Sequence, residues 1–104
     1  MAKVQVIARF VAREGSERQL RALLQSMLAP TRAEQGCEMY ELYESDSKGR
    51  FYLNETWASQ AALDQHMATP HFGRLEQTGG KLVREPFEIN IVKRLAGAAR
   101  RDIR

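Results

Sequence analysis

Residues 37–57 have the sequence CEMYELYESDSKGRFYLNETW, which predicts a β-hairpin about which the rest of the chain is arranged. Residues 37–44 and 51–57 have the composition of strands, and DSKG at 46–49 supplies the residues of a turn. The turn leaves the pairing of the two strands open by one residue. Either Tyr40 or Tyr43 is therefore expected on the same face of the hairpin as Glu55.

A helix is predicted on the N-terminal side of the hairpin. It begins at Ser16, with Gln19 as the partner in a capping box. Apolar residues then follow at the spacing of one helical face, at Leu20, Leu23, Leu24, Met27 and Leu28. Pro30 is expected to end or kink this helix, and Gly36 to stop one further turn.

A helical region broken in two is predicted on the C-terminal side of the hairpin. Ser59 is expected to cap the first, short helix. A cap followed by proline, Thr69-Pro70, begins the second helix, and Gly79-Gly80 ends it.

Strands are predicted at both ends of this arrangement. In residues 3–11 two sets of residues alternate: Val4, Val6, Ala8 and Phe10 against Gln5, Ile7, Arg9 and Val11. In residues 87–94 the alternating sets are Phe87, Ile89 and Ile91 against Glu88, Asn90 and Val92. The order β-α-β-β-α-β predicts an α+β, ferredoxin-like fold, with helices on one face of a four-stranded antiparallel sheet.

The other face of the predicted sheet carries apolar residues that the helices cannot cover. Ile7, Val11 and Val92 point away from the main apolar sets of their strands. An open apolar face needs a partner. The simplest partner is a second copy related by a two-fold axis, so a homodimer formed through sheet faces is expected.

Composition places the chain among soluble single-domain proteins. Its 104 residues are divided into a domain at 1–94 and a basic, flexible tail at 95–104. Basic residues are concentrated at the C-terminal end, at Lys93, Arg94, Arg100, Arg101 and Arg104. The body has no basic face that would favour nucleic acid, and no apolar run of the ~20 residues that span a membrane. Because no signal-peptide pattern is present, the protein is expected to be cytoplasmic. The single cysteine, Cys37, excludes an intrachain disulfide and a cysteine-based zinc site.

The chain's only tryptophan and both of its histidines lie in residues 54–72, NETWASQAALDQHMATPHF. A short loop after Trp57 turns the next helix back over the strand, so Trp57 and His66 are expected to approach each other. They are expected to line a pocket between the sheet and the helices, and not merely to pack a junction. His66 is the candidate general base, because its ordinary pKa near 6.5 suits proton removal at neutral pH. Glu55, a buried carboxylate that needs a partner, is expected to orient His66 or to meet Tyr40.

Further residues are candidates for binding a substrate. They are His71, Phe72, Tyr40, Tyr43 and Arg32, the last as a contact for an anionic group. No metal site is predicted, because His66 and His71 lie on either side of a helix break, where poor ligand geometry is expected. There is also no glycine-rich phosphate loop.

Four segments of the chain resemble a known family. They are G-x-E at 15–17, PTRAEQGC at 30–37, YELY at 40–43, and ETW with ALDQHMATPHF within 55–72. Together they resemble the antibiotic biosynthesis monooxygenase (ABM) family, in its small quinol-monooxygenase-like branch. The resemblance implies a dimeric α+β barrel with a pocket between sheet and helices. It also implies oxidation of a phenolic or quinol substrate by O₂ without cofactor, with Trp57 and His66 matching the pocket pair of the family.

Other reactions occur among proteins similar to this family. The haem-degrading branch has an asparagine on the first strand, whereas residues 3–11 contain none and Ala8 lies at or beside that place. An isomerase would need a phosphate site, for which Arg32, Arg74 and Lys81 are available. A small-molecule isomerase and a non-catalytic, ligand-binding role therefore stay open as alternatives to the monooxygenase.

Overall fold

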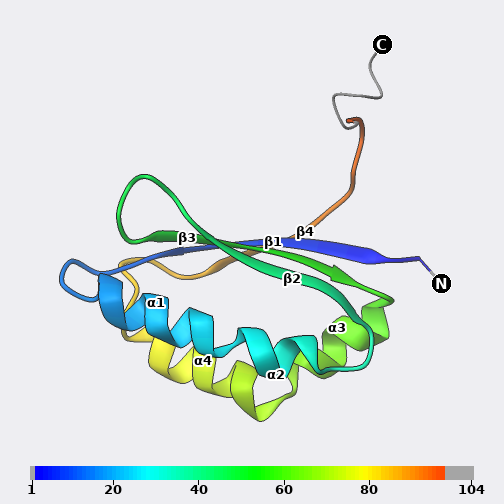
Figure 1. The fold of residues 1–104 in the computed structure, drawn as a ribbon, viewed down its shortest axis with the longest axis horizontal. Helices are drawn as coiled ribbons and strands as arrows, with labels where there is room; N and C mark the ends of the chain where they lie inside the picture. Colours follow the sequence, from blue (N-terminus) through cyan, green and yellow to red (C-terminus); the bar gives the residue numbers. More distant parts are fainter. Residues whose placement is uncertain (1, 98–104) are drawn as a thin grey trace.

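The computed structural model describes residues 2–97 and contains the antiparallel four-stranded sheet that the sequence predicts. The strands are β1 (Val4–Val11), β2 (Cys37–Glu44), β3 (Arg50–Trp57) and β4 (Glu88–Val92). The helices are α1 (Glu17–Ser26), α2 (Leu28–Arg32), α3 (Gln60–Met67) and α4 (Pro70–Gly80). The strands are ordered β2-β3-β1-β4, and the helices of the described chain lie on one face of the sheet (Figure 1). The predicted α+β, ferredoxin-like fold is confirmed.

The core lies between the sheet and the helices. Val6, Ala8 and Phe10 of β1 are buried, as their alternation predicts. The helices contribute side chains of α1 and of the residue that follows it, namely Leu20, Leu24 and Met27. Each fully buried leucine or phenylalanine contributes roughly 1.5–3 kcal/mol relative to an exposed one, so these contacts hold the helical layer on the sheet.

The first helix begins and ends differently from the sequence-based expectation. Ser16 is the N-cap residue, but its side chain makes no capping hydrogen bond, so the predicted capping box is wrong. The Glu17 carboxylate instead accepts a hydrogen bond from the backbone N–H of Gly15. The helix breaks at Met27, and Pro30 lies inside the short α2. Pro30 has no N–H to donate to the carbonyl of Ser26, four residues earlier, so one α-helical hydrogen bond is missing where α1 ends and α2 begins.

The two caps predicted after the hairpin are confirmed. The Ser59 side chain accepts a hydrogen bond from the Ala62 N–H at the start of α3. The Thr69 side chain accepts one from the Phe72 N–H, and Pro70 is the first residue of α4. These caps fix where both helices begin, and therefore how the α3–α4 junction approaches the sheet.

The register of the hairpin settles which tyrosine faces the helices. Tyr40 pairs with Glu55, and both are buried on the helix-covered face. Tyr43 pairs with Tyr52 on the opposite face and is 51% exposed. A bulge between Cys37 and Met39 shifts the register at the start of β2. Because side chains alternate along a strand, this shift decides on which face of the sheet the β2 residues before Met39 lie.

The helix-free face of the sheet is only partly as predicted. Ile7 lies on it and is 41% exposed. Val11 was also expected to be left uncovered, but it is only 4% exposed, so that part of the expectation is wrong. The chain after α4 returns across the end of β1, where Arg84 donates a backbone hydrogen bond to the Val11 carbonyl.

The edge strand β4 carries two exposed isoleucines. Ile89 and Ile91 pair with Ala8 and Val6, which places them on the helix-side face as predicted. They are nevertheless 43% and 60% exposed, because β4 lies at the sheet edge beyond the cover of the helices.

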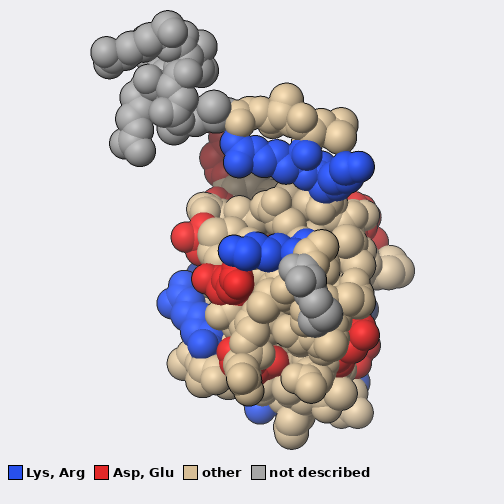
Figure 2. All heavy atoms as spheres, turned by 90° about the vertical axis from the view of Figure 1, so that its right-hand side faces the viewer, with Lys and Arg blue, Asp and Glu red and all other residues tan. Residues whose placement is uncertain are grey.

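Charged side chains of both signs are interspersed over the face that Figure 2 shows, with basic side chains near the segment that leads away from β4. Of the predicted tail at 95–104, only residues 95–97 lie within the described part.

Across residues 2–97, no helix has the length and apolar character that crossing a membrane requires.

Candidate active site

The predicted approach of Trp57 and His66 occurs at the junction of β3 and α3. Trp57 is the last residue of β3, and α3 begins three residues later. The short connection turns α3 back over the sheet, so that the indole and imidazole centroids are 4.6 Å apart with planes inclined at 33°. Trp57 is fully buried and His66 is 2% exposed. The two rings are therefore in direct contact in the interior.

Other rings complete a cage around the His66 imidazole. The Phe72 ring lies edge-on at 5.2 Å and the Tyr40 ring at 5.8 Å, measured between ring centroids. His71, in the first turn of α4, lies at 5.9 Å. The structure thus brings together five of the predicted site residues. They come from β2, β3, α3 and α4.

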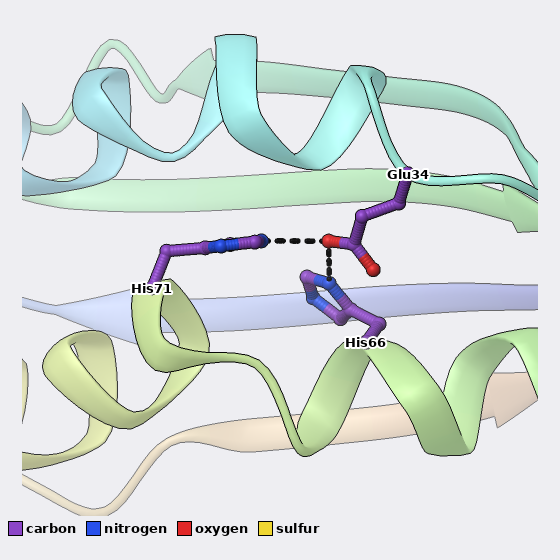
Figure 3. A group of neighbouring side chains, drawn as sticks. All are labelled: Glu34, His66 and His71. Carbon is purple, nitrogen blue, oxygen red and sulfur yellow. Dashed lines mark hydrogen bonds and ion pairs between the residues drawn. The ribbon is translucent and has the colours of Figure 1, made fainter.

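A residue that the sequence-based interpretation missed connects the two histidines. Oxygen Oε2 of Glu34 lies 2.7 Å from Nδ1 of His66 and 2.7 Å from Nε2 of His71. Figure 3 shows both contacts ending on the same oxygen, with Glu34 reaching down from the loop after α2. The side chains of Glu34 and His71 are 14% and 15% exposed, so this end of the cluster reaches the surface.

The carboxylate determines the protonation pattern of both rings. An ionised carboxylate can only accept hydrogen bonds, so Nδ1 of His66 and Nε2 of His71 are the protonated nitrogens in the neutral rings. The second nitrogen of each ring, Nε2 of His66 and Nδ1 of His71, then carries a free lone pair. Burial lowers the pKa of the His66 imidazole below its ordinary value, while the hydrogen bond and negative charge of Glu34 oppose this shift. His66 is therefore neutral at pH 7 and basic at Nε2.

Glu55 lies opposite Tyr40 across the hairpin, which is one of the two expected arrangements, but its hydrogen-bond partner is Trp57. Its Oε1 accepts a hydrogen bond of 2.9 Å from the indole Nε1 of Trp57. Desolvation raises the pKa of Glu55 to about 7, and the nearby charge of Glu34 adds to this, while the Trp57 hydrogen bond opposes it. The carboxyl thus holds the indole in place and is close to half-protonated at neutral pH.

The remaining candidates are divided between the two faces of the sheet. Tyr40 belongs to the cage, and burial raises the pKa of its hydroxyl. Within residues 2–97 neither this hydroxyl nor that of Thr31 has a hydrogen-bond partner, although both are buried. Tyr43 lies on the opposite face and donates to Glu41. Arg32 is exposed, and its guanidinium donates two hydrogen bonds to the backbone carbonyl of Tyr40.

Four hollows are found on the surface of residues 2–97, and neither Trp57 nor His66 lines any of these four. One of about 290 Å³ is bordered by Arg32 and Tyr40 at the start of β2. Another of about 670 Å³ lies on the helix-free face, where Ile7 and Val92 border it. The His66 side chain is 2% exposed, so a ligand reaches its ring only if a neighbouring side chain moves.

The same three polar side chains form a possible set of metal ligands. The ligand atoms of Glu34, His66 and His71 all lie within 4.8 Å of one another. The expectation that a helix break gives the two imidazoles poor ligand geometry is wrong in this respect, because the turn between α3 and α4 directs both rings at one oxygen.

The residues around Glu34 in the sequence give no indication that its side chain contacts the two histidines. It lies 32 residues before His66 and 37 before His71, in a segment with no hydrophobic period. It does belong to the PTRAEQGC segment noted above for its resemblance to a family. The one available indication was thus a motif, and no rule of spacing joined it to the histidines.

Comparison with known proteins gives a consistent family. A family model described as antibiotic biosynthesis monooxygenase matches residues 4–77, a range that includes the whole cluster. A protein of Mycobacterium tuberculosis named "Putative monooxygenase Rv0793" is 42% identical over 96 residues, which are 92% of this chain and 95% of the relative. The solved structure of Rv0793 matches with a TM-score of 0.86 at 41% identity, covering 94% of this chain and 100% of that chain.

Two further relatives extend the match to other bacteria. The crystal structure of PA3566 from Pseudomonas aeruginosa has a TM-score of 0.84 at 33% identity, covering 92% of this chain and 97% of that chain. A Bacillus subtilis protein named "Putative monooxygenase YcnE" is 32% identical over 66 residues, which are 62% of this chain and 70% of the relative.

Proposed function

Because the chain belongs to the antibiotic biosynthesis monooxygenase family, we propose that it oxidises a small phenol or quinol with O₂, without a cofactor, and that His66 is the general base. The observation that carries this proposal is the pair of hydrogen bonds that Glu34 accepts from His66 and His71. A base that is held in one tautomer by a carboxylate is a recurring arrangement for proton removal.

The base acts through Nε2 of His66. Glu34 holds the proton at Nδ1, so Nε2 keeps its lone pair and takes the proton of the phenolic hydroxyl. Burial keeps the ring neutral, and the negative charge of Glu34 stabilises the imidazolium that forms. Both conditions favour transfer of a proton to His66 at neutral pH.

Aromatic side chains supply the rest of the site. The rings of Trp57, Tyr40 and Phe72 surround the imidazole and suit stacking against a flat aromatic substrate. Glu55 is a positioning residue, because it holds the indole of Trp57 through Nε1.

The overall reaction needs no reductant besides the substrate. Deprotonation makes the quinol electron-rich enough to transfer one electron to O₂. If one oxygen atom then enters the ring and the other leaves as water, a hydroquinone becomes a hydroxyquinone and supplies all four electrons that reduce O₂. The protein contributes a base, a water-poor aromatic site and fixed polar groups.

The test is O₂ consumption with a panel of quinols and polyphenols, followed by mass analysis of the product formed under ¹⁸O₂. We expect one labelled oxygen atom in the product. His66→Gln, which keeps the approximate size of the side chain, should lower kcat/KM by about 10²-fold or more while the melting temperature changes little. Gln65→Ala, at the exposed neighbouring position of α3, is the matched control and should retain activity.

Two outcomes would contradict the proposal. Full activity in a folded His66→Gln protein would remove His66 as the base. Wild-type protein that binds quinols without consuming O₂ would instead favour a ligand-binding member of the family.

We also propose that the protein is a homodimer whose subunits meet through the helix-free face of the sheet. Ile7 is 41% exposed on this face, and the 670 Å³ hollow beside it is also bordered by Val92 and Leu95. A second copy would cover these apolar side chains, whereas the helices of the same chain lie on the other face (Figure 1).

A further inference from the structure

The cluster of Glu34, His66 and His71 has the composition of a metal-binding site. Two imidazole nitrogens and one carboxylate oxygen are the ligand set of catalytic zinc sites and of non-haem iron sites. The three ligands come from separate segments, namely the loop after α2, the last turn of α3 and the first turn of α4. We propose that these three side chains bind one divalent first-row transition-metal ion per chain.

The distances in the cluster are close to those that such an ion requires. In a site with metal–ligand distances of about 2.1 Å, neighbouring ligand atoms lie roughly 3.0–3.4 Å apart. Oxygen Oε2 of Glu34 is 2.7 Å from each nitrogen, and the three atoms lie within 4.8 Å of one another. The carboxylate oxygen therefore needs to withdraw from each nitrogen by roughly 0.3–0.7 Å. The two nitrogens, which lie within 4.8 Å of each other, need to reach a similar separation of roughly 3.0–3.4 Å, so binding requires rotations of the side chains.

The charge and exposure of the cluster also favour a cation. Glu34 is largely buried between two imidazole rings, which are neutral when they donate hydrogen bonds to its negative charge. A divalent ion would compensate this charge directly. His71 and Glu34 are 15% and 14% exposed, whereas His66 is 2% exposed at the back of the cluster. An ion can thus enter from the side of His71.

Coordination changes the tautomer of His66. The ion takes the lone pair at Nδ1, so the proton that Nδ1 donated to Glu34 exchanges through water and the neutral ring carries its proton at Nε2. The nitrogen assigned above as the base is then no longer basic. The bound ion is therefore expected to suppress base catalysis, but the binding itself does not depend on the proposed function.

The binding experiment uses untagged, chelator-treated protein with Cys37→Ser, which removes the competing thiol. Co²⁺ is titrated and followed by its visible d–d absorption, and calorimetry gives the stoichiometry. We expect one ion per chain. His71→Gln and Glu34→Gln should each weaken binding by about 10²-fold or more, because even the loss of an outer hydrogen bond to a ligand costs roughly 10–100-fold.

Asp64→Asn is the matched control. Asp64 is an exposed carboxylate on α3, hydrogen-bonded to Gln60 and outside the cluster. This variant should bind Co²⁺ as tightly as the parent. The absence of saturable binding, or equal affinity in the parent and the His71→Gln and Glu34→Gln variants, would overturn the inference.

A second measurement identifies the ligand atom on His66. With Zn²⁺, which is diamagnetic, the ¹⁵N resonances of the ring should show coordination at Nδ1 and a proton at Nε2. Coordination at Nε2 would overturn the arrangement proposed here. Metal binding by a protein that never consumes O₂ would support this inference and contradict the proposed function. Oxygenase activity in a protein that binds no metal would support the proposed function and overturn this inference.

Discussion

The carboxylate of Glu34 accepts hydrogen bonds from two imidazoles that lie on different helices. Its charge opposes the effect of burial on His66, and its position fixes which nitrogen of each ring is protonated. A single oxygen atom thus couples the protonation of both histidines. This makes Glu34 the side chain whose substitution is most informative at the scale of the residue.

Glu34→Gln keeps the size of the side chain and removes the charge. We expect the pKa of His66 to fall further, because the charge and hydrogen bond that raise it are weakened. Quinol oxidation should fall by about 10²-fold, since the imidazolium loses its counter-charge. An NMR titration of the His66 ring and kcat/KM on the same protein check this. Glu38→Gln, which removes a carboxylate paired with Lys3, is the control; an unchanged His66 titration in Glu34→Gln would contradict the assignment.

Glu55 predicts a pH dependence of stability. Its pKa is raised from 4.5 to about 7 in the folded protein. The group therefore contributes stability that is fully present below pH ~4.5 and is lost as the pH rises through ~7, because the unfolded chain ionises more readily. The free energy of unfolding should fall by up to about 3 kcal/mol between pH 5 and pH 8 on this account.

Glu55→Gln should largely remove this pH dependence. The amide oxygen can still accept the hydrogen bond of Trp57, and nothing in the side chain ionises. Urea unfolding at several pH values gives the comparison. Glu76→Gln, at an exposed position of α4, should keep the wild-type dependence. A Glu55→Gln protein with the wild-type slope would assign the dependence to another group.

At the scale of elements, the site depends on how the loop after α2 meets α3. Gly36 in this loop has φ +91°, and a Cβ atom there would lie 2.6 Å from the Cβ of Ala62 on α3. Gly36 thus allows a close approach of loop and helix. This approach brings Glu34, two residues earlier, within reach of the α3–α4 junction.

Gly36→Ala should destabilise the protein by about 2 kcal/mol or more, because it adds backbone strain and a steric overlap. The melting temperature should fall by roughly 10 °C. Gly73→Ala is the matched control, since nothing lies within 4 Å of its added Cβ on α4. It should stabilise the helix by about 0.5–1 kcal/mol. Equal melting temperatures for the two variants would mean that the contact between loop and α3 is looser than described.

At the scale of the whole molecule, one face of the sheet is covered by helices and the other is open (Figure 1). On the open face Ile7 lies between Asn54 of β3 and Asn90 of β4, so a moderately apolar centre is bordered by amides. Such a mixed surface fits an interface with a polar rim.

Ile7→Asp should convert the proposed homodimer to monomers, because it leaves an unpaired charge in a desolvated interface. Sedimentation at micromolar concentration measures the change. Gln25→Asp, on the exposed side of α1, should leave the dimer intact. A wild-type protein that sediments as a monomer would exclude the dimer itself, whereas a dimeric Ile7→Asp protein would place the interface elsewhere.

Local patterns in the sequence were enough to determine most of the fold. Alternation in β1 gave its buried face, and the caps at Ser59 and Thr69 gave the starts of α3 and α4. These predictions succeed because each depends on residues within a few positions of one another. The contact between Trp57 and His66 could be predicted for the same reason, since only a short connection separates β3 from α3. Ser16 makes no side-chain cap because its backbone, at φ −107° and ψ 8°, is outside the extended conformation that Ser59 and Thr69 have at their caps.

Only the tertiary structure decided the polar partners of the site and the exposure of the strands. Glu34 meets His66 and His71 across 32 and 37 residues, and it does so because the loop at Gly36 packs closely on α3. The packed structure also decided that Glu55 accepts a hydrogen bond from Trp57, two residues further along the same face of β3, and not from Tyr40, its neighbour across the hairpin. Ile89 and Ile91 are exposed because β4 is an edge strand. Each of these depends on how distant segments pack, which no local pattern of residues specifies.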